Sequence, residues 1–358
     1  MCNGTIMDKL ISFALPLMVS SILQLLFNAV DIIVVGRFTG SQALAAVGST
    51  TALINMFVNL FIGVSLGANV LSARFYAAGK EREMSETVHT AMTFALISGI
   101  VMVFVGLFCT RGALELMDTP ADVIDQAALY MKIYFCSMPF FMLYNYGAAV
   151  LRAVGDTKRP LLFLIISGAI NAVLNLFLVI AFSMGVAGGA IATVISQVIS
   201  CVLVLWCLFT TDSCYRLQIS KLGIKGEYLL QIFQVGVPAG IQSVVINFSN
   251  VLLQSSVNSF GSIAMAGYTA ANKLYGILES ASVAFGYAMT AYMGQNRGAR
   301  NAARIDAGIR AVLVLSAEFT AAIVTAMLVA GKPLLGLFLA TEEAGAADAL
   351  AVAYQYLM

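Results

Sequence analysis

The sequence places one carboxylate deep inside a long apolar segment. Asp31 lies in the predicted helix 10–36, within the sequence Asn28-Ala-Val-Asp-Ile-Ile-Val-Val. Gln24, Asn28 and Asp31 follow one another at i, i+4 and i+7, which places them on one helical face. Burial away from water favours the protonated form of a carboxyl group, as a group that exchanges protons near neutral pH requires. The alternative is an acid near a membrane surface that pairs with Arg37.

Polar side chains of two later apolar segments are candidates to complete a site around Asp31. Asn171 and Asn175 lie four residues apart in one segment, and Thr193 lies in the next. If these segments close into a bundle, we expect the three side chains to surround Asp31. Carboxylate and amide oxygens also suit a hard cation, so Asp31, Asn171 and Asn175 are the candidate ligands if the ion is sodium. The alternative is ordinary hydrogen bonding between membrane helices.

A second group of polar residues could line a space for a substrate. The predicted helix 228–258 carries a stripe of amide side chains on one face, which is typical of a cavity wall, although helix packing would also use such a stripe. A further acid, in the segment 262–292, is a candidate for holding a cationic substrate. The candidate cavity residues are Tyr144, Asn247, Asn250, Gln254 and Glu279.

Pro16 lies in the same predicted helix as Asp31, fifteen residues before it. Proline removes one backbone N–H and permits a helix to bend. We therefore hypothesise that bending at Pro16 couples protonation of Asp31 to the shape of the cavity.

The composition indicates the medium in which these residues act. Hydrophobic residues make up 60% of the 358 positions and charged residues 10%, where a soluble domain carries about 25% charged residues. Nineteen basic residues face eighteen acidic ones, so no basic excess exists to bind nucleic acid. A soluble domain and a disordered chain are both excluded, and a polytopic protein of the lipid bilayer is predicted.

Cysteine and histidine usage excludes several kinds of site. The six cysteines include no C-x-x-C pair, and His89 is the only histidine. A disulfide framework, a zinc site or a multi-histidine metal centre is therefore not expected. The first apolar run lacks a clear cleavage site, so we interpret it as a retained span.

Long charge-free runs predict an all-α membrane protein. Residues 38–73 and 160–211 contain no charged side chain, and about 20 apolar residues cross a bilayer as a helix. Strands are disfavoured because the runs are long and do not alternate. The predicted helices are 10–36, 43–74, 87–110, 123–151, 160–182, 187–211, 228–258, 262–292 and 305–330, with a tenth beginning near 345.

The chain repeats itself at an offset of 222 residues. Pro16 then meets Pro238, and Asn28 meets Asn250. Six helices separate the copies, so both insert in the same orientation, as parallel repeats. We predict a six-helix lobe over 1–215 and an incomplete second lobe over 216–358. On symmetry, the last two to three helices of a twelve-helix fold are expected to be absent from this chain.

Loop charges predict the orientation in the membrane. With the N-terminus in the cytoplasm, fourteen Lys and Arg residues fall in cytoplasmic loops or at helix ends and four on the other side. Such an excess is the usual signature of the cytoplasmic face. We expect a multi-pass protein of the cell (inner) membrane.

Taken together, these motifs resemble those of the multidrug and toxic compound extrusion (MATE) family, in its MepA-like branch close to the DinF-like group. The resemblance covers the whole chain. It rests on Pro16 with Val30-Asp-Ile-Ile-Val-Val-Gly-Arg, on Leu151-Arg-Ala-Val-Gly-Asp-Thr-Lys-Arg-Pro160, on Asn171-Ala-Val-Leu-Asn175 and on Gln295-Asn-Arg-Gly-Ala.

The resemblance implies twelve helices in two lobes and export of cationic amphipathic compounds, driven by inward flow of H⁺ or Na⁺. It implies that Asp31 is the coupling acid, with Gln24, Asn171, Asn175 and Thr193 as its polar neighbours. This sequence departs from the family at Asn175, where many relatives carry a second acid. Ile246 and Asn247 also occupy the region of an acid that another branch carries.

The sequence therefore predicts a secondary antiporter for a small cationic compound. It would act as a monomer, without enzymatic activity and without a cofactor other than the coupling ion. One alternative is a flippase for lipid-linked saccharides of the same superfamily, although such a cavity should carry more Arg and Lys. Another is a membrane-embedded enzyme that uses Glu81, Glu83 and Glu86, which lie among basic residues in a mixed-charge loop.

Overall fold

The computed structural model describes residues 1–39, 41–116, 119, 123–258, 260, 262–336 and 346–357, and its regular elements in these ranges are all helical. The long helices are α1 (Ile6–Thr39), α2 (Ser41–Ala77), α3 (Glu81–Leu116), α6 (Lys158–Leu176), α7 (Gly185–Thr210), α8 (Gly226–Asn258), α9 (Ser262–Gly298) and α10 (Ala302–Gly336). The shorter elements are α4 (Ile124–Cys136), α5 (Met138–Ala153), η1 (Phe177–Ala181), η2 (Ile219–Lys221) and α11 (Ala346–Leu357).

Within the described residues, seven helices are long and apolar enough to cross a membrane, and the bent pair α4 and α5 makes an eighth. This confirms the predicted all-α, multi-pass class. Several helices run beyond their apolar stretches: α3 begins at Glu81, where 87 was predicted. Its first turns pair Arg82 with Glu86 at i, i+4 and Lys80 with Glu83 at i, i+3, which supports helix outside the apolar run.

The predicted helix 123–151 is two helices, because α4 and α5 meet at an angle of 47°. Pro139 lies in the first turn of α5, where its ring and missing N–H cannot continue the helix before it. Gly99 of α3 packs directly on this break, since a Cβ added to it would lie 2.4 Å from the Cα of Pro139.

The N-terminal part of the chain has one large buried core. Apolar side chains of α2, α3, α4, α5 and α7 meet there, with Phe135 and Tyr146 fully buried. The segment between α7 and α8 also enters this core through Tyr215 and Leu217. The connection that leads to the second half of the chain is therefore packed against the first half.

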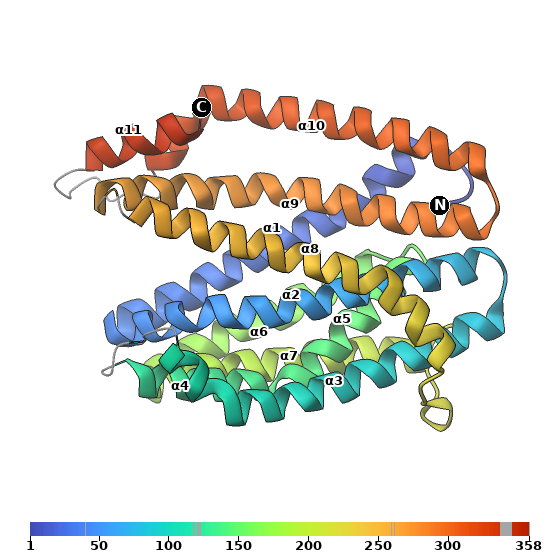
Figure 1. Cartoon of the computed structure of the whole chain (residues 1–358), viewed down its shortest axis with the longest axis horizontal. Coiled ribbons are helices and arrows are strands. Elements are labelled where there is room, and N and C mark those ends of the chain that lie inside the picture. Colours follow the sequence, from blue (N-terminus) through green and yellow to red (C-terminus); the bar gives the residue numbers. More distant parts are fainter. Residues whose placement is uncertain are drawn as a thin grey trace.

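Helix α1 packs on both halves of the molecule (Figure 1). Leu10, Phe13 and Leu17 share a buried cluster with Phe285 of α9 and Leu315 of α10. The later part of α1 instead contacts α6, through Phe27 and Asp31. Pro16 is buried near the change from one set of neighbours to the other.

Glycines let α2 and α8 approach to backbone contact. We define the glycine seam as Gly63, Gly67, Gly236 and Gly240. A Cβ added at Gly63 would lie 2.2 Å from the Cα of Gly240, and one added at Gly67 would lie 2.1 Å from the carbonyl oxygen of Ile232. Small residues provide such close packing in membranes, where lipid supplies little hydrophobic drive between helices. The seam thus joins the two halves of the chain.

Candidate functional site

Asp31 of α1 and Asn175 of α6 meet, although 144 residues separate them in the sequence. Asn175 Nδ2 donates a hydrogen bond of 2.5 Å to Asp31 Oδ1. Asn175 is fully buried and Asp31 is partly buried. The predicted coupling acid and one of its predicted polar neighbours are therefore in direct contact.

Close packing of α1 on α6 explains this contact. Gly168 faces the ring of Phe27, and a Cβ added to Gly168 would lie 2.0 Å from a carbon of that ring. Phe27 precedes Asp31 by four residues and Gly168 precedes Asn175 by seven, so each pair shares a helical face. The missing side chain at Gly168 lets α1 come close enough for the hydrogen bond to form.

A second polar contact lies one turn away on α6. Asn171, which is buried, donates to the hydroxyl of Ser196 on α7 at 3.5 Å. Ser196 in turn donates to the backbone carbonyl of Thr193 at 2.8 Å, and the Thr193 hydroxyl donates to the carbonyl of Gly189. Asn171 and Thr193 therefore belong to one network, but its described hydrogen bonds do not include the Asp31 carboxylate.

The other two members of the predicted α1 stripe differ from Asp31 in their exposure. Gln24 and Asn28 are exposed, whereas Asp31 is partly buried. The described hydrogen bonds of Asp31 come from α6 and not from its own helix. The i, i+4, i+7 spacing thus identified a helical face, but it did not determine which residues of that face become enclosed.

Sequence reasoning missed two residues near this site. Tyr130 of α4 lies in the neighbourhood of Asp31, and its ring stacks on Tyr134 with centroids 6.3 Å apart. Ser196 is the partner of Asn171. The available signals were the i, i+4 spacing of the two tyrosines and the i, i+3 spacing of Thr193 and Ser196.

The predicted cavity residues do not bond to one another among the described contacts. The Tyr144 hydroxyl donates to the carbonyl of Pro160 at 3.2 Å, and Asn247 donates to the carbonyl of Ser243 on its own helix. Asn250 and Glu279 are exposed. The side chain of Gln254 lies outside the described residues. These contacts support the helix-packing alternative for Tyr144 and Asn247 as much as a role in binding.

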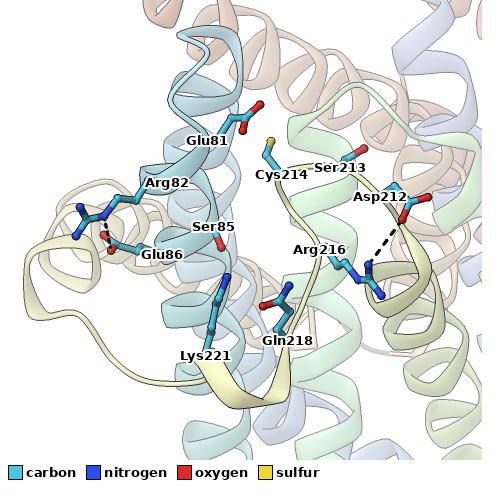
Figure 2. A pocket seen from close by; sticks show the side chains of 10 residues that line it. All are labelled: Glu81, Arg82, Ser85, Glu86, Asp212, Ser213, Cys214, Arg216, Gln218 and Lys221. Atoms are coloured by element: carbon cyan, nitrogen blue, oxygen red, sulfur yellow. Dashed lines mark hydrogen bonds and ion pairs between the residues drawn. The ribbon is translucent and has the colours of Figure 1, made fainter.

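A charged cleft of about 610 Å³ lies between the start of α3 and the connection to α8 (Figure 2). It is lined by Glu81, Arg82, Ser85, Glu86, Asp212, Ser213, Cys214, Arg216, Gln218 and Lys221. Its charges are largely paired within the cleft and its rim, since Arg82 lies 3.2 Å from Glu86, Lys225 lies 3.5 Å from Glu86, and Arg216 lies 3.7 Å from Asp212.

The acids at the start of α3 are not grouped as metal ligands among the described residues. Glu86, which lines the cleft, is paired with Arg82, and Glu83, which does not line it, is paired with Lys80. Within the described part of the chain, no group of three or more His, Cys, Asp or Glu side chains could hold a metal ion. The cleft also lies at the opposite end of α2 from Asp31, because α3 follows the end of α2 and α1 precedes its start.

Comparisons with known proteins agree with this architecture. The family model described as MatE matches residues 16–177 and 238–358, two segments whose starts are 222 residues apart. The Probable multidrug resistance protein YoeA of Bacillus subtilis (strain 168) is 31% identical over 355 residues, which cover 97% of this chain and 75% of that relative. The Multidrug export protein MepA of Staphylococcus aureus (strain NCTC 8325 / PS 47) is 22% identical over 327 residues, covering 89% and 72%.

Solved structures show the same fold. The structure "Outward-facing conformation of a multidrug resistance MATE family transporter of the MOP superfamily" superimposes with a TM-score of 0.92 at 21% sequence identity. The match covers 99% of this chain and 78% of that one. At this identity the likeness establishes the fold alone.

Proposed function

Because the chain belongs to the MATE family of multi-pass cell-membrane transporters, we propose that it is a secondary antiporter that exports cationic amphipathic compounds in exchange for protons or sodium ions. Relatives named as multidrug resistance and multidrug export proteins support multidrug efflux as the activity. The observation that carries the coupling step is the hydrogen bond from Asn175 to the Asp31 carboxylate.

The contacts of Asp31 suit a group that binds and releases a cation. Asn175 occupies one carboxylate oxygen, Oδ1, and no described hydrogen bond occupies the other. Asn175 Oδ1 is itself a buried acceptor without a hydrogen-bond partner among the described residues. Leaving such an acceptor unpaired costs about 1–3 kcal/mol. A sodium ion beside the carboxylate would use this oxygen, whereas a proton would bind the carboxylate itself.

The proposed energy source is the membrane potential together with the ion gradient. Moving one elementary charge across 100 mV is worth about 2.3 kcal/mol. Neutralising Asp31 removes a charge from the region between α1 and α6, and this changes the energetic cost of moving the two helices apart. Ion binding is thereby linked to the position of α1.

The proposal includes the orientation and the unit of function. Two lobes, 1–215 and 216–358, would face one another, with the N-terminus in the cytoplasm because fourteen basic residues fall on that side. One copy of the chain would suffice, since the ion site and the glycine seam are both formed within it.

The test is ethidium efflux from vesicles that contain the protein, with proton and sodium gradients imposed separately. The wild-type protein should respond to one of the two gradients. Asp31→Asn keeps the size of the side chain but removes its charge, so gradient-driven efflux should be lost. Glu318→Gln is the matched control, because Glu318 is an exposed acid of α10 that lies outside the proposed site.

Two results of this test would contradict the proposal. Full coupled transport by Asp31→Asn would mean that Asp31 is structural. If the wild-type protein moves ethidium under neither gradient, the antiporter proposal fails and a lipid or saccharide cargo becomes the better hypothesis.

A further inference from the structure

A positive charge lies against an aromatic ring where α5 meets α9. Arg152 is in the last turn of α5, and its guanidinium carbon lies 5.8 Å from the centroid of the Tyr287 ring on α9. Both residues are partly buried. Among the described contacts Arg152 has no carboxylate within ion-pair distance and donates no hydrogen bond.

The helical geometry directs this side chain into the molecule. A helical side chain leans toward the N-terminus of its helix, so Arg152 leans from the end of α5 back toward Tyr144, two turns earlier. The contact of its guanidinium carbon with the Tyr287 ring agrees with this direction. The guanidinium group of the first half is therefore placed against an aromatic side chain of the second half.

Neighbouring contacts hold α5 and α9 together in this conformation. Gln295 Nε2 donates a 2.7 Å hydrogen bond to the carbonyl of Ala153, the residue that follows Arg152. One turn further along α9, Gly298 packs so closely on α2 that an added Cβ would lie 2.0 Å from the carbonyl oxygen of Arg74. Tyr287 lies two turns before Gln295 on the same helix. The contact between Arg152 and the Tyr287 ring therefore requires the two halves to be closed at this end of the molecule.

We propose that the Tyr287 ring is a binding site for the cationic group of the transported compound, and that Arg152 occupies this site in the conformation described here. The inference rests on the proposed export of organic cations. The face of an aromatic ring attracts cations, most strongly when they are desolvated. A guanidinium group and an organic cation cannot both cover the same face, so the two compete for it.

This competition gives transport a direction. When α9 separates from α5, Tyr287 loses Arg152 and is open to a cation from the end of the molecule that carries the α5–α6 and α9–α10 connections. When the two halves close at that end, Arg152 returns to the ring and displaces the cation. Arg152 is suited to exchange in this way, because no ion pair or hydrogen bond among the described contacts holds its guanidinium group.

A second pair of the same type shows the contrast. Arg304 lies 6.0 Å from the centroid of the Tyr292 ring, but it also donates hydrogen bonds to the carbonyls of Met1 and Gly4 at 3.2 and 2.7 Å. These bonds fix the guanidinium group to the N-terminal segment. The Arg304–Tyr292 pair is thus a fixed structural contact, and it provides a control for the proposed site.

The test measures ethidium binding by fluorescence in detergent-solubilised protein, without any gradient. Tyr287→Leu removes the ring and should weaken ethidium binding on the order of fivefold. Tyr287→Phe keeps the ring and should bind like the wild type. Arg152→Gln removes the competing cation, so it should bind ethidium more tightly, and Arg304→Gln should leave the affinity unchanged.

The outcomes separate this site from the proposed function. Wild-type affinity in a folded Tyr287→Leu protein that still exports ethidium would overturn the site while the antiporter proposal stands. If Tyr287→Leu does not fold, unchanged or weaker binding by Arg152→Gln overturns it instead. The binding assay uses no gradient, so its result does not depend on ion coupling. Absence of gradient-driven ethidium efflux by the wild-type protein would therefore count against the proposed function alone.

Discussion

Among the described contacts, the Asp31 carboxylate accepts one hydrogen bond, from an amide group of another helix. A hydrogen bond to an ionised acceptor is stronger than one between neutral groups, and this one is short, at 2.5 Å. The same amide leaves its own oxygen buried and without a hydrogen-bond partner among the described residues. Asn175 therefore donates to the Asp31 carboxylate, and in the proposed mechanism its free oxygen would be a ligand if the coupling ion is sodium. Its two atoms should then respond differently to the two candidate ions.

Replacing Asn175 should distinguish protons from sodium. Asn175→Ala removes a hydrogen bond to a charged group, worth about 1.5–3 kcal/mol, so half-saturation by the coupling ion should shift on the order of tenfold. In a proton-driven protein the ionised carboxylate loses its donor, and half-saturation should move to lower proton concentration. In a sodium-driven protein an oxygen ligand is lost, and more sodium should be required.

The measurement is ethidium efflux as a function of pH and of sodium concentration. Asn145→Ala is the matched control, because the Asn145 amide bonds to the carbonyl of Phe141 on its own helix. An Asn175→Ala protein with unchanged ion dependence would show that the hydrogen bond to Asp31 has no part in coupling.

Helix α3 holds the connection between the two halves through adjacent residues. His89 Nε2 accepts a hydrogen bond from the backbone N–H of Gln218 at 3.0 Å, while His89 Nδ1 donates to the carbonyl of Ser85 at 2.7 Å. The Thr90 hydroxyl accepts from the backbone N–H of Lys225. The only histidine of the sequence is therefore a buried ring that fixes this connection to α3.

Loss of this acceptor should free the connection. His89→Leu leaves the partly buried N–H of Gln218 unpaired, which costs up to about 3 kcal/mol, so local opening should become several-fold more frequent. Limited trypsin digestion after Arg216 and Lys221 should speed up accordingly. Thr90→Val is the comparison variant, because it removes the acceptor of the Lys225 N–H, which lies nearer α8. Equal cleavage rates in His89→Leu and in the wild-type protein would contradict the role of His89.

The molecule as a whole is two sets of helices joined along α2 and by α1. The glycine seam holds α2 against α8 at backbone contact, so relative movement of the two halves must be accommodated in other elements. Helix α1 contacts both sets, and Pro16 lies within it, with its carbonyl accepting a 2.8 Å hydrogen bond from Ser20. We propose that α1 bends at Pro16 and thereby transmits the state of Asp31 to the second half.

Straightening α1 should uncouple transport from the ion. Pro16→Ala restores a backbone N–H and removes the ring that opposes a regular helix, so ion-coupled ethidium efflux should fall several-fold while ethidium binding persists. Pro238→Ala in α8 is the matched control, because the position corresponding to Asp31 in that repeat is Leu253. Wild-type coupling in the Pro16→Ala protein would rule out bending at Pro16 as the link.

The sequence alone determined the class of protein, the main helices and the residue at the centre of the candidate site. Long apolar runs dictate membrane helices because backbone groups in lipid must bond within their own segment, and an acid inside such a run must face polar groups. Both signals are local in the sequence, so Asp31 and the membrane spans could be predicted without knowledge of the fold. Pro139 is also a local signal for a helix break, but it lies within a continuous apolar run, and the run was therefore predicted as one helix.

Tertiary structure decided which polar groups meet. Asp31 is hydrogen-bonded to Asn175, and Asn171 to Ser196. Gln24 and Asn28 are exposed. Arg152 lies against the ring of Tyr287. These contacts depend on close approach between helices, as at Gly168 and in the glycine seam. Such close approach depends on the shapes of two helix surfaces that are distant in sequence. The spacing of residues along one helix therefore does not show which surface packs against it.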